Sequence, residues 1–138
     1  MAYDILWRLH AILMCGAFLC MCTGAVISLL YKKRKWRYKT HKTLGISAGI
    51  LGISAFIIAF VMVQLYGAHF TSFHGGVGFA AALLLILTPT AGLRIRRSKN
   101  KKRARLLHKT MGYLTLATMA LNVTLGLLLA IDRGLIAS

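Results

Sequence analysis

The pentapeptide His41-Lys-Thr-Leu-Gly45 returns as His108-Lys-Thr-Met-Gly112 in the second half of the chain. Each copy follows a run of basic residues and opens a long apolar segment. A second pair repeats in the same way, because His10 and His74 are separated by nearly the same interval and each begins another apolar segment. The chain therefore reads as two tandem halves, each with two apolar segments.

The four apolar segments predict an integral membrane protein. The chain has 138 residues, of which 58% are hydrophobic, and its mean hydropathy is +0.70. Each segment has about 20 residues, enough for a helix to cross a hydrocarbon core of about 30 Å. We predict an all-α, four-transmembrane-helix up-down bundle with parallel internal duplication, one domain over residues 1–138. The expected spans are residues 10–31, 41–66, 73–94 and 106–131.

The charge distribution indicates the orientation of the bundle. Eighteen Lys and Arg stand against two Asp and Glu, a net charge of +16. A soluble protein with this charge would be a candidate for binding nucleic acid, but these charges are confined to short runs between apolar segments, so no nucleic acid is expected. Sixteen of the 18 basic residues lie in residues 32–42 and 94–109. The positive-inside rule then predicts cytoplasmic basic loops and extracytoplasmic N and C termini. The same loops are candidates for binding anionic lipid or an anionic reductant.

Three cysteines, Cys15, Cys20 and Cys22, lie inside the first apolar segment. We interpret them as small packing residues, with a thiol or metal site as the alternative. No Cys-x-x-Cys-His motif is present, which excludes covalently attached c-type haem. The first segment is also too long for the apolar core of a signal peptide.

The repeat predicts which histidines meet. Two halves of the same orientation are related by a pseudo-twofold axis along the membrane normal, so equivalent residues face each other at equal depth. His41 should meet His108 at the inner level, and His10 should meet His74 at the outer level. Ionisable residues inside a membrane mark a functional site by default. Structural zinc takes four ligands, whereas haem iron takes axial ligands from opposite sides. The sequence therefore predicts haem at both levels.

Glycines support a slot for a flat cofactor. Gly45, Gly78 and Gly112 each follow a histidine by four residues, which places glycine and histidine on one helix face. Gly49 and Gly52 continue that face in the second segment. The alternative is that small residues tighten helix packing.

Three further positions complete the candidates. Met14 occupies the position four residues after His10, so the first segment departs from the glycine pattern. Asn122 lies 14 residues beyond His108, near the outer level, where it could hydrogen-bond to the cofactor or link two helices. His69 has no counterpart in the other half and is a minor candidate for a proton or substrate role.

At these residues the chain resembles the cytochrome b561 family, from about residue 8 to residue 131. The matching features are His10-Ala-Ile-Leu-Met14, the basic run before His41, Phe73-His74 with Gly78, and His108 with Gly112. The resemblance implies two non-covalent b haems, with His10 and His74 as iron ligands of the outer haem and His41 and His108 as those of the inner haem. It also implies electron transfer across the membrane.

The resemblance carries two further expectations. Eukaryotic members usually have two additional flanking helices, so this chain looks like the bare core of prokaryotic members or electron-transfer subunits. That favours a prokaryotic inner membrane. In ascorbate-using members, lysines just before the inner histidine help to hold the reductant, and Lys35 and Lys39 fall at similar positions.

We therefore expect a di-haem b-type cytochrome that moves electrons between a cytoplasmic-side or membrane donor and an extracytoplasmic acceptor, or the reverse. Candidate redox partners are a quinone, an ascorbate-like reductant, a ferric chelate and a partner cytochrome. One alternative is a haem-bearing membrane anchor subunit of a larger quinone-linked oxidoreductase. Another is a haem-free membrane scaffold or lipid-binding protein. A homodimer and a subunit of a complex are both compatible with the sequence.

Overall fold

The computed structural model describes residues 2–67 and 72–135. Its elements are α1 (Ala2–Leu30), α2 (Arg37–Tyr66), α3 (Phe73–Arg94), the short 3₁₀ helix η1 (Ile95–Arg97) and α4 (Lys101–Asp132). Within the described ranges there is no strand. The predicted all-α bundle of four long apolar helices is confirmed.

Local side chains mark where the second hairpin's helices begin. The Ser72 hydroxyl accepts a hydrogen bond from the backbone N–H of Gly75 at 3.1 Å and caps α3. Asn100 does the same for α4, since its side-chain oxygen accepts from the backbone N–H of Arg103 at 3.0 Å. Both bonds satisfy N–H groups that a helix start otherwise leaves unpaired. Gly67 follows α2 with φ of 75°, which glycine adopts without a steric penalty.

Three helices begin before the apolar segments do. Helices α1, α2 and α4 have 29, 30 and 32 residues. At about 1.5 Å per residue they are roughly 44 to 48 Å long and exceed a hydrocarbon core of about 30 Å. All four long helices are apolar enough to cross a membrane. The basic first turns of α2 and α4 therefore extend beyond the hydrocarbon.

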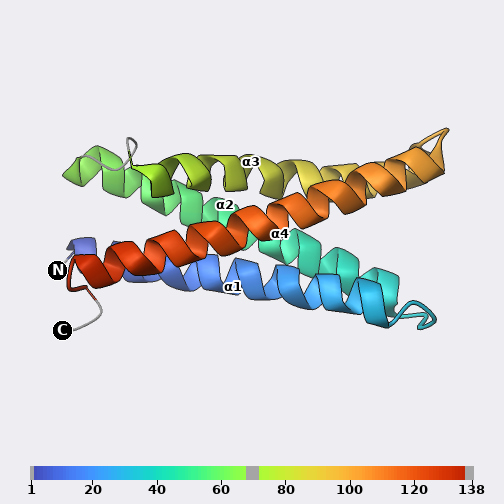
Figure 1. Ribbon diagram of the computed structural model, residues 1–138, viewed down its shortest axis with the longest axis horizontal. Coiled ribbons are helices and arrows are strands. Elements are labelled where there is room, and N and C mark those ends of the chain that lie inside the picture. Colours follow the sequence, from blue (N-terminus) through green and yellow to red (C-terminus); the bar gives the residue numbers. More distant parts are fainter. Residues whose placement is uncertain (1, 68–71, 136–138) are drawn as a thin grey trace.

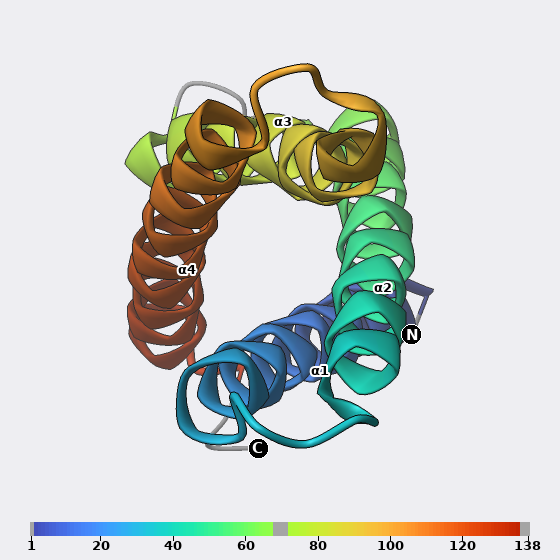
Figure 2. The ribbon, with the colours of Figure 1, turned by 90° about the vertical axis from the view of Figure 1, so that its right-hand side faces the viewer.

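The helices form a ring in chain order. Helix α1 packs mainly on α2 and α3 mainly on α4, and the two hairpins meet through α2 with α3 and α1 with α4. Viewed along the long axis, α1 stands opposite α3 and α2 opposite α4 (Figure 2). The start of α1 and the end of α4 lie at one end of the bundle, and the two loops within the hairpins lie at the other (Figure 1).

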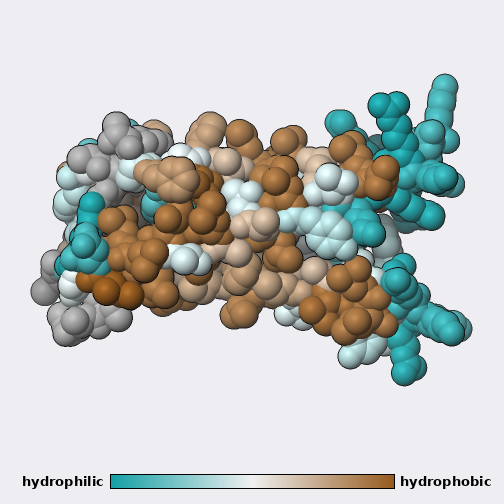
Figure 3. Space-filling model, in the orientation of Figure 1, coloured by the Kyte–Doolittle hydropathy of each residue, from teal (hydrophilic) through white to brown (hydrophobic). Residues whose placement is uncertain are grey.

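The outer surface of the bundle carries many large apolar side chains. Large aliphatic side chains face outward along the helices, whereas the buried core consists mostly of small residues and methionines. Exposed examples are Ile12, Leu19, Ile50, Leu65, Leu114 and Leu128. Hydrophilic side chains gather at the end that carries the hairpin loops (Figure 3). This distribution suits a protein whose sides are covered by lipid.

Glycines bring the two hairpins close together. A Cβ added to Gly49 would lie 3.4 Å from the backbone oxygen of Leu85 and 4.0 Å from Cγ of Pro89. Pro89 has no N–H to bond that oxygen four residues earlier. A Cβ on Gly52 would collide with the Leu85 side chain. At these two positions the alternative of tight helix packing is therefore the correct interpretation, because Leu85 fills the space above them.

Candidate cofactor sites

The bundle brings the four repeated histidines together in two pairs. The imidazole centroids of His10 and His74 are 6.4 Å apart, with ring planes at 85°. Those of His41 and His108 are 5.9 Å apart, with planes at 79°. Each pair spans a diagonal of the ring, α1 with α3 and α2 with α4. We call the His10–His74 pair the terminal site and the His41–His108 pair the basic-loop site, after the two ends of the bundle.

Three of these imidazoles are held by a backbone carbonyl of the neighbouring helix in the same hairpin. The bonds are His10 Nδ1 to Ala55 O at 2.9 Å, His41 Nδ1 to Gly24 O at 2.9 Å and His108 Nδ1 to Thr88 O at 3.0 Å. A carbonyl oxygen only accepts, so Nδ1 carries the proton and donates. That tautomer leaves the lone pair of Nε2 available to a metal, the usual arrangement of a ligating histidine.

A spacing of 14 residues underlies this pattern. Each long helix carries one of the four paired histidines. In α1, α2 and α3, the residue 14 positions later accepts a hydrogen bond from the histidine of the hairpin neighbour. The four steps run from His10 to Gly24, His41 to Ala55, His74 to Thr88 and His108 to Asn122. Fourteen residues of helix rise about 21 Å, so the two sites lie at well-separated depths.

The paired imidazoles fit the axial positions of haem iron. Two bonds of about 2 Å to a central metal, plus about 1 Å from each nitrogen to its ring centre, place two imidazole centroids roughly 6 Å apart. Both observed separations agree with that value. In the described part of the chain, His, Cys, Asp and Glu nowhere form a group of three or more that could hold a metal ion. Two protein nitrogens suffice for haem, because its macrocycle supplies the other ligands.

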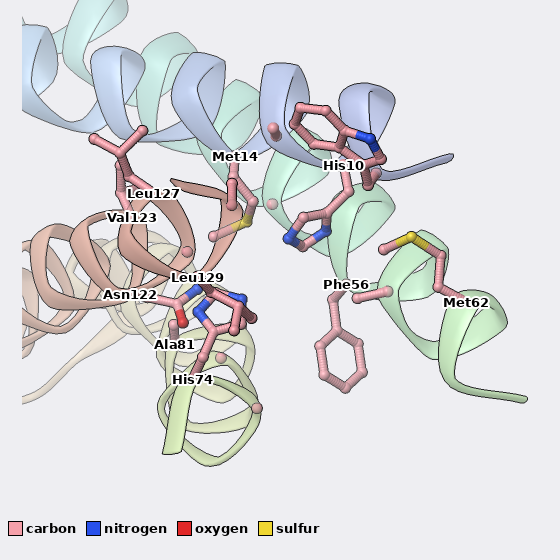
Figure 4. A pocket seen from close by; sticks show the side chains of 18 of the residues that line it. His10, Met14, Phe56, Met62, His74, Ala81, Asn122, Val123, Leu127 and Leu129 are labelled. Atoms are coloured by element: carbon pink, nitrogen blue, oxygen red, sulfur yellow. The ribbon is translucent and has the colours of Figure 1, made fainter. Parts of the chain in front are cut away.

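A cavity of about 300 Å³ surrounds the terminal site. It lies between His10 and His74, and its walls are mostly apolar, as is usual for a cofactor pocket (Figure 4). Its lining also includes the buried Asn122 amide and the side chains of Tyr3 and Arg133. This donor set suits an apolar macrocycle that carries carboxylates at its edge.

The predicted slot glycines have different surroundings. Nothing lies within 4 Å of a Cβ added to Gly45 or Gly112. A Cβ on Gly78 would instead lie 3.5 Å from Oδ1 of Asn122. The open space beside Gly45 and Gly112 suits a macrocycle, whereas Gly78 makes room for Asn122. A role for all three in cofactor binding remains a prediction.

Two glycines that sequence reasoning missed lie directly against imidazoles. An added Cβ would lie 2.8 Å from Cε1 of His108 at Gly92, and 3.0 Å from Cε1 of His74 at Gly126. Both contacts are between neighbours in the α3–α4 hairpin. The 14-residue spacing could have revealed this packing, because each of these glycines lies four residues beyond a position that faces a histidine.

The remaining candidates are two lysines, three cysteines and one further histidine. Lys35 is exposed in the turn before α2, and Lys39 is exposed in the first turn of that helix. His69 falls outside the described residues. The cysteines are free thiols: Cys15 is exposed and lines the terminal cavity, whereas Cys20 and Cys22 are partly buried.

Paired imidazoles at two depths of a membrane-spanning four-helix bundle are the arrangement of a b-type membrane cytochrome. The model of the eukaryotic cytochrome b561 family matches residues 9–132, and the chain belongs to that family. The predicted resemblance is thereby confirmed. Family membership implies binding of b-type haem and electron transfer across the membrane.

Searches among curated proteins and among solved structures each returned no match. The matched family is described as eukaryotic. The expectation of a prokaryotic inner membrane therefore has no support, while an integral, multi-pass location agrees with the four apolar helices.

Proposed function

We propose that this chain is a di-haem cytochrome that conducts electrons between the two faces of a membrane. The observation that carries the proposal is the presence of two equivalent bis-histidine sites at two depths of one apolar bundle. His10 and His74 would hold one haem at the terminal site, and His41 and His108 a second at the basic-loop site.

Bound haem supplies one-electron chemistry at iron, and the protein supplies the ligands and their surroundings. The carbonyls of Ala55, Gly24 and Thr88 orient three imidazoles and keep the proton on Nδ1. The apolar walls exclude water and bury the macrocycle. Gly45, Gly78, Gly112 and Asn122 complete the proposed surroundings of the two cofactors.

The two ends of the bundle would meet different partners. By the positive-inside rule, the end with the basic loops faces the cytoplasm and both termini lie outside. An anionic reductant would approach the basic-loop site, where Lys35 and Lys39 are exposed. The terminal end carries Arg8 and Arg133 as its basic residues. A quinone, a ferric chelate or a partner cytochrome would exchange electrons there.

The test is the haem content of the full-length protein after expression with sufficient haem. We expect two haems per chain in the native protein and one each in His10→Ala and His41→Ala, quantified by pyridine haemochrome against protein. Lys42→Ala is the matched control, because Lys42 adjoins His41, is exposed, and should leave both haems in place.

Two results would contradict the proposal. Native protein without a Soret band would indicate the haem-free scaffold instead. Two haems retained in either histidine variant would show that the substituted histidine is not an essential ligand.

A further inference from the structure

Residue 122 occupies the fourth position of the 14-residue pattern. Ala55 is the equivalent residue of the first hairpin, and its backbone oxygen accepts the Nδ1 proton of His10. His74 is in turn the equivalent of His10 in the second hairpin. The repeat therefore places Asn122 beside His74 at the terminal site. Unlike Ala55, it brings a side-chain carbonyl as well as a backbone one.

The Asn122 side chain is buried with an unused acceptor. Its exposed fraction is 2%, and its Oδ1 has no hydrogen-bond partner among the described residues. Leaving a buried polar atom unsatisfied costs on the order of 1–3 kcal/mol. Such atoms are rare in folded proteins and call for an explanation at the site where they occur.

Contacts between α3 and α4 hold this amide in the wall of the terminal cavity. Gly78 and Gly126 each lie four residues from one of the two side chains, His74 on α3 and Asn122 on α4. Asn122 packs over Gly78, while the His74 ring packs over Gly126. Figure 4 shows the amide and the imidazole in the same part of the cavity wall.

The first hairpin fills the same layer in the opposite way. There Met14 stands at the position of Gly78, and Ala55 at the position of Asn122. The larger side chain of the layer is therefore a methionine thioether on α1 in the first hairpin and an asparagine amide on α4 in the second. At these two positions, only the second hairpin contributes a polar side chain to the terminal site.

We propose that Asn122 is a positioning residue of the terminal site, whose side-chain oxygen accepts a hydrogen bond from Nδ1–H of His74. This inference rests on the proposed haem ligation by His74. The bond would fix the ring and direct Nε2 toward the iron, as the backbone carbonyls do for the other three histidines.

The bond would also set the electronic character of the ligand. A hydrogen bond from Nδ1–H to a good acceptor makes the imidazole a more basic ligand, which stabilises the oxidised iron and lowers its reduction potential. Removing the acceptor should raise the potential of the terminal haem. The basic-loop haem, about 21 Å away along α4, should not change.

The experiment is a redox titration of full-length protein with Asn122→Leu and Asn122→Ala, followed by visible spectroscopy. Leucine keeps the branched shape and the number of heavy atoms of the asparagine side chain over Gly78, whereas alanine copies the residue of the first hairpin. The terminal step is assigned with His41→Ala, which retains that haem. Thr115→Val, a buried substitution one heptad away on α4, is the control.

Both Asn122 variants should keep two haems and show the same upward shift of the terminal midpoint potential alone, with the control unchanged. Unchanged potentials would show that His74 does not need the side-chain oxygen of Asn122, because the backbone carbonyl of residue 122 would be a sufficient acceptor. That result would overturn the inference. A shift in Asn122→Ala only would indicate a packing defect, and loss of the terminal haem from both variants a role in holding the pocket together. Either would also overturn it. Native protein that binds two haems keeps the proposed function intact in all these cases.

Discussion

The two hairpins share one frame but fill it differently. All four paired histidines, and Gly45 with Gly112, recur at corresponding positions of the two halves. Next to the terminal site, however, the first hairpin has Met14 and Ala55 where the second has Gly78 and Asn122. The proposed ligands and slot glycines recur, whereas at the neighbouring positions the larger side chain lies on α1 in the first hairpin and on α4 in the second. In a close-packed interior a small residue on one helix leaves room for a larger one on its neighbour.

The same contrast appears nearer the basic-loop site. Thr88 and Thr115 of the second hairpin share a buried hydrogen bond of 2.7 Å between their hydroxyls. The equivalent residues of the first hairpin are Gly24 and Ala48, which have no polar side chains. The backbone oxygens of Gly24 and Thr88 nevertheless do the same work, since each accepts from a histidine. The contact to each histidine therefore depends on the backbone here and does not require the same side chains in the two hairpins.

The largest expected effect comes from Gly92, which packs against the ring of His108. Gly92→Leu should displace His108, because even a Cβ at this position would lie 2.8 Å from its ring. We expect loss of one haem of two, measured by pyridine haemochrome. The equivalent residue of the first hairpin is Ser28, so Ser28→Ala serves as the control and should retain both haems. Full haem content in Gly92→Leu would show that His108 is not confined as the structure has it.

The next effect tests whether the open space beside the repeated glycines is a cofactor slot. Gly45→Leu and Gly112→Leu meet no atom within 4 Å of the first added carbon, so the helices should still assemble. If the macrocycle occupies this space, both variants should lose most of the haem of the basic-loop site. Helicity by circular dichroism and haem content should be measured together. Full haem content with native helicity in both variants would assign these glycines to another role.

A smaller effect should distinguish the two contacts between the hairpins, α2 with α3 and α1 with α4. Gly52→Leu should destabilise the bundle by about 1–3 kcal/mol through overpacking against Leu85. At the equivalent position of the second hairpin, Met119 is fully buried, and Met119→Leu conserves volume, so its cost should stay below about 1.5 kcal/mol. Unfolding of the cofactor-free protein in mixed detergent micelles measures both. Equal losses of stability would contradict the difference between these two contacts.

The smallest effect concerns the threonine pair. A double-mutant cycle of Thr88→Val and Thr115→Val should give a coupling free energy of roughly 0.6–1 kcal/mol, the usual range for hydrogen bonds between membrane helices. The same unfolding assay supplies the four stabilities. A coupling near zero would mean that the bond between the hydroxyls adds no net stability, and that the bond which the Thr115 hydroxyl donates to the backbone oxygen of Met111 is sufficient for it.

Much of this protein follows from the sequence. Length and hydropathy determine four spans, because a membrane leaves the backbone few alternatives to helices. The intervals between the repeated histidines determine which residues pair, because a parallel duplication brings equivalent positions to one axis. The structure agrees with that pairing, and the family match confirms the resemblance that the four histidines predicted.

Only the tertiary structure decided what surrounds each histidine. Sequence alone did not identify Gly24, Ala55 and Thr88 as acceptors, because their backbone oxygens carry no signature in residue type. The sequence pattern also predicted that Gly49 and Gly52 belong to a cofactor face, although Leu85 of α3 covers them. The pentapeptide at His41 and His108 thus determined the frame, whereas packing across helices determined the environment. Periodicity reports which residues share a face of one helix, but only the assembled bundle shows which neighbour fills the space beside it.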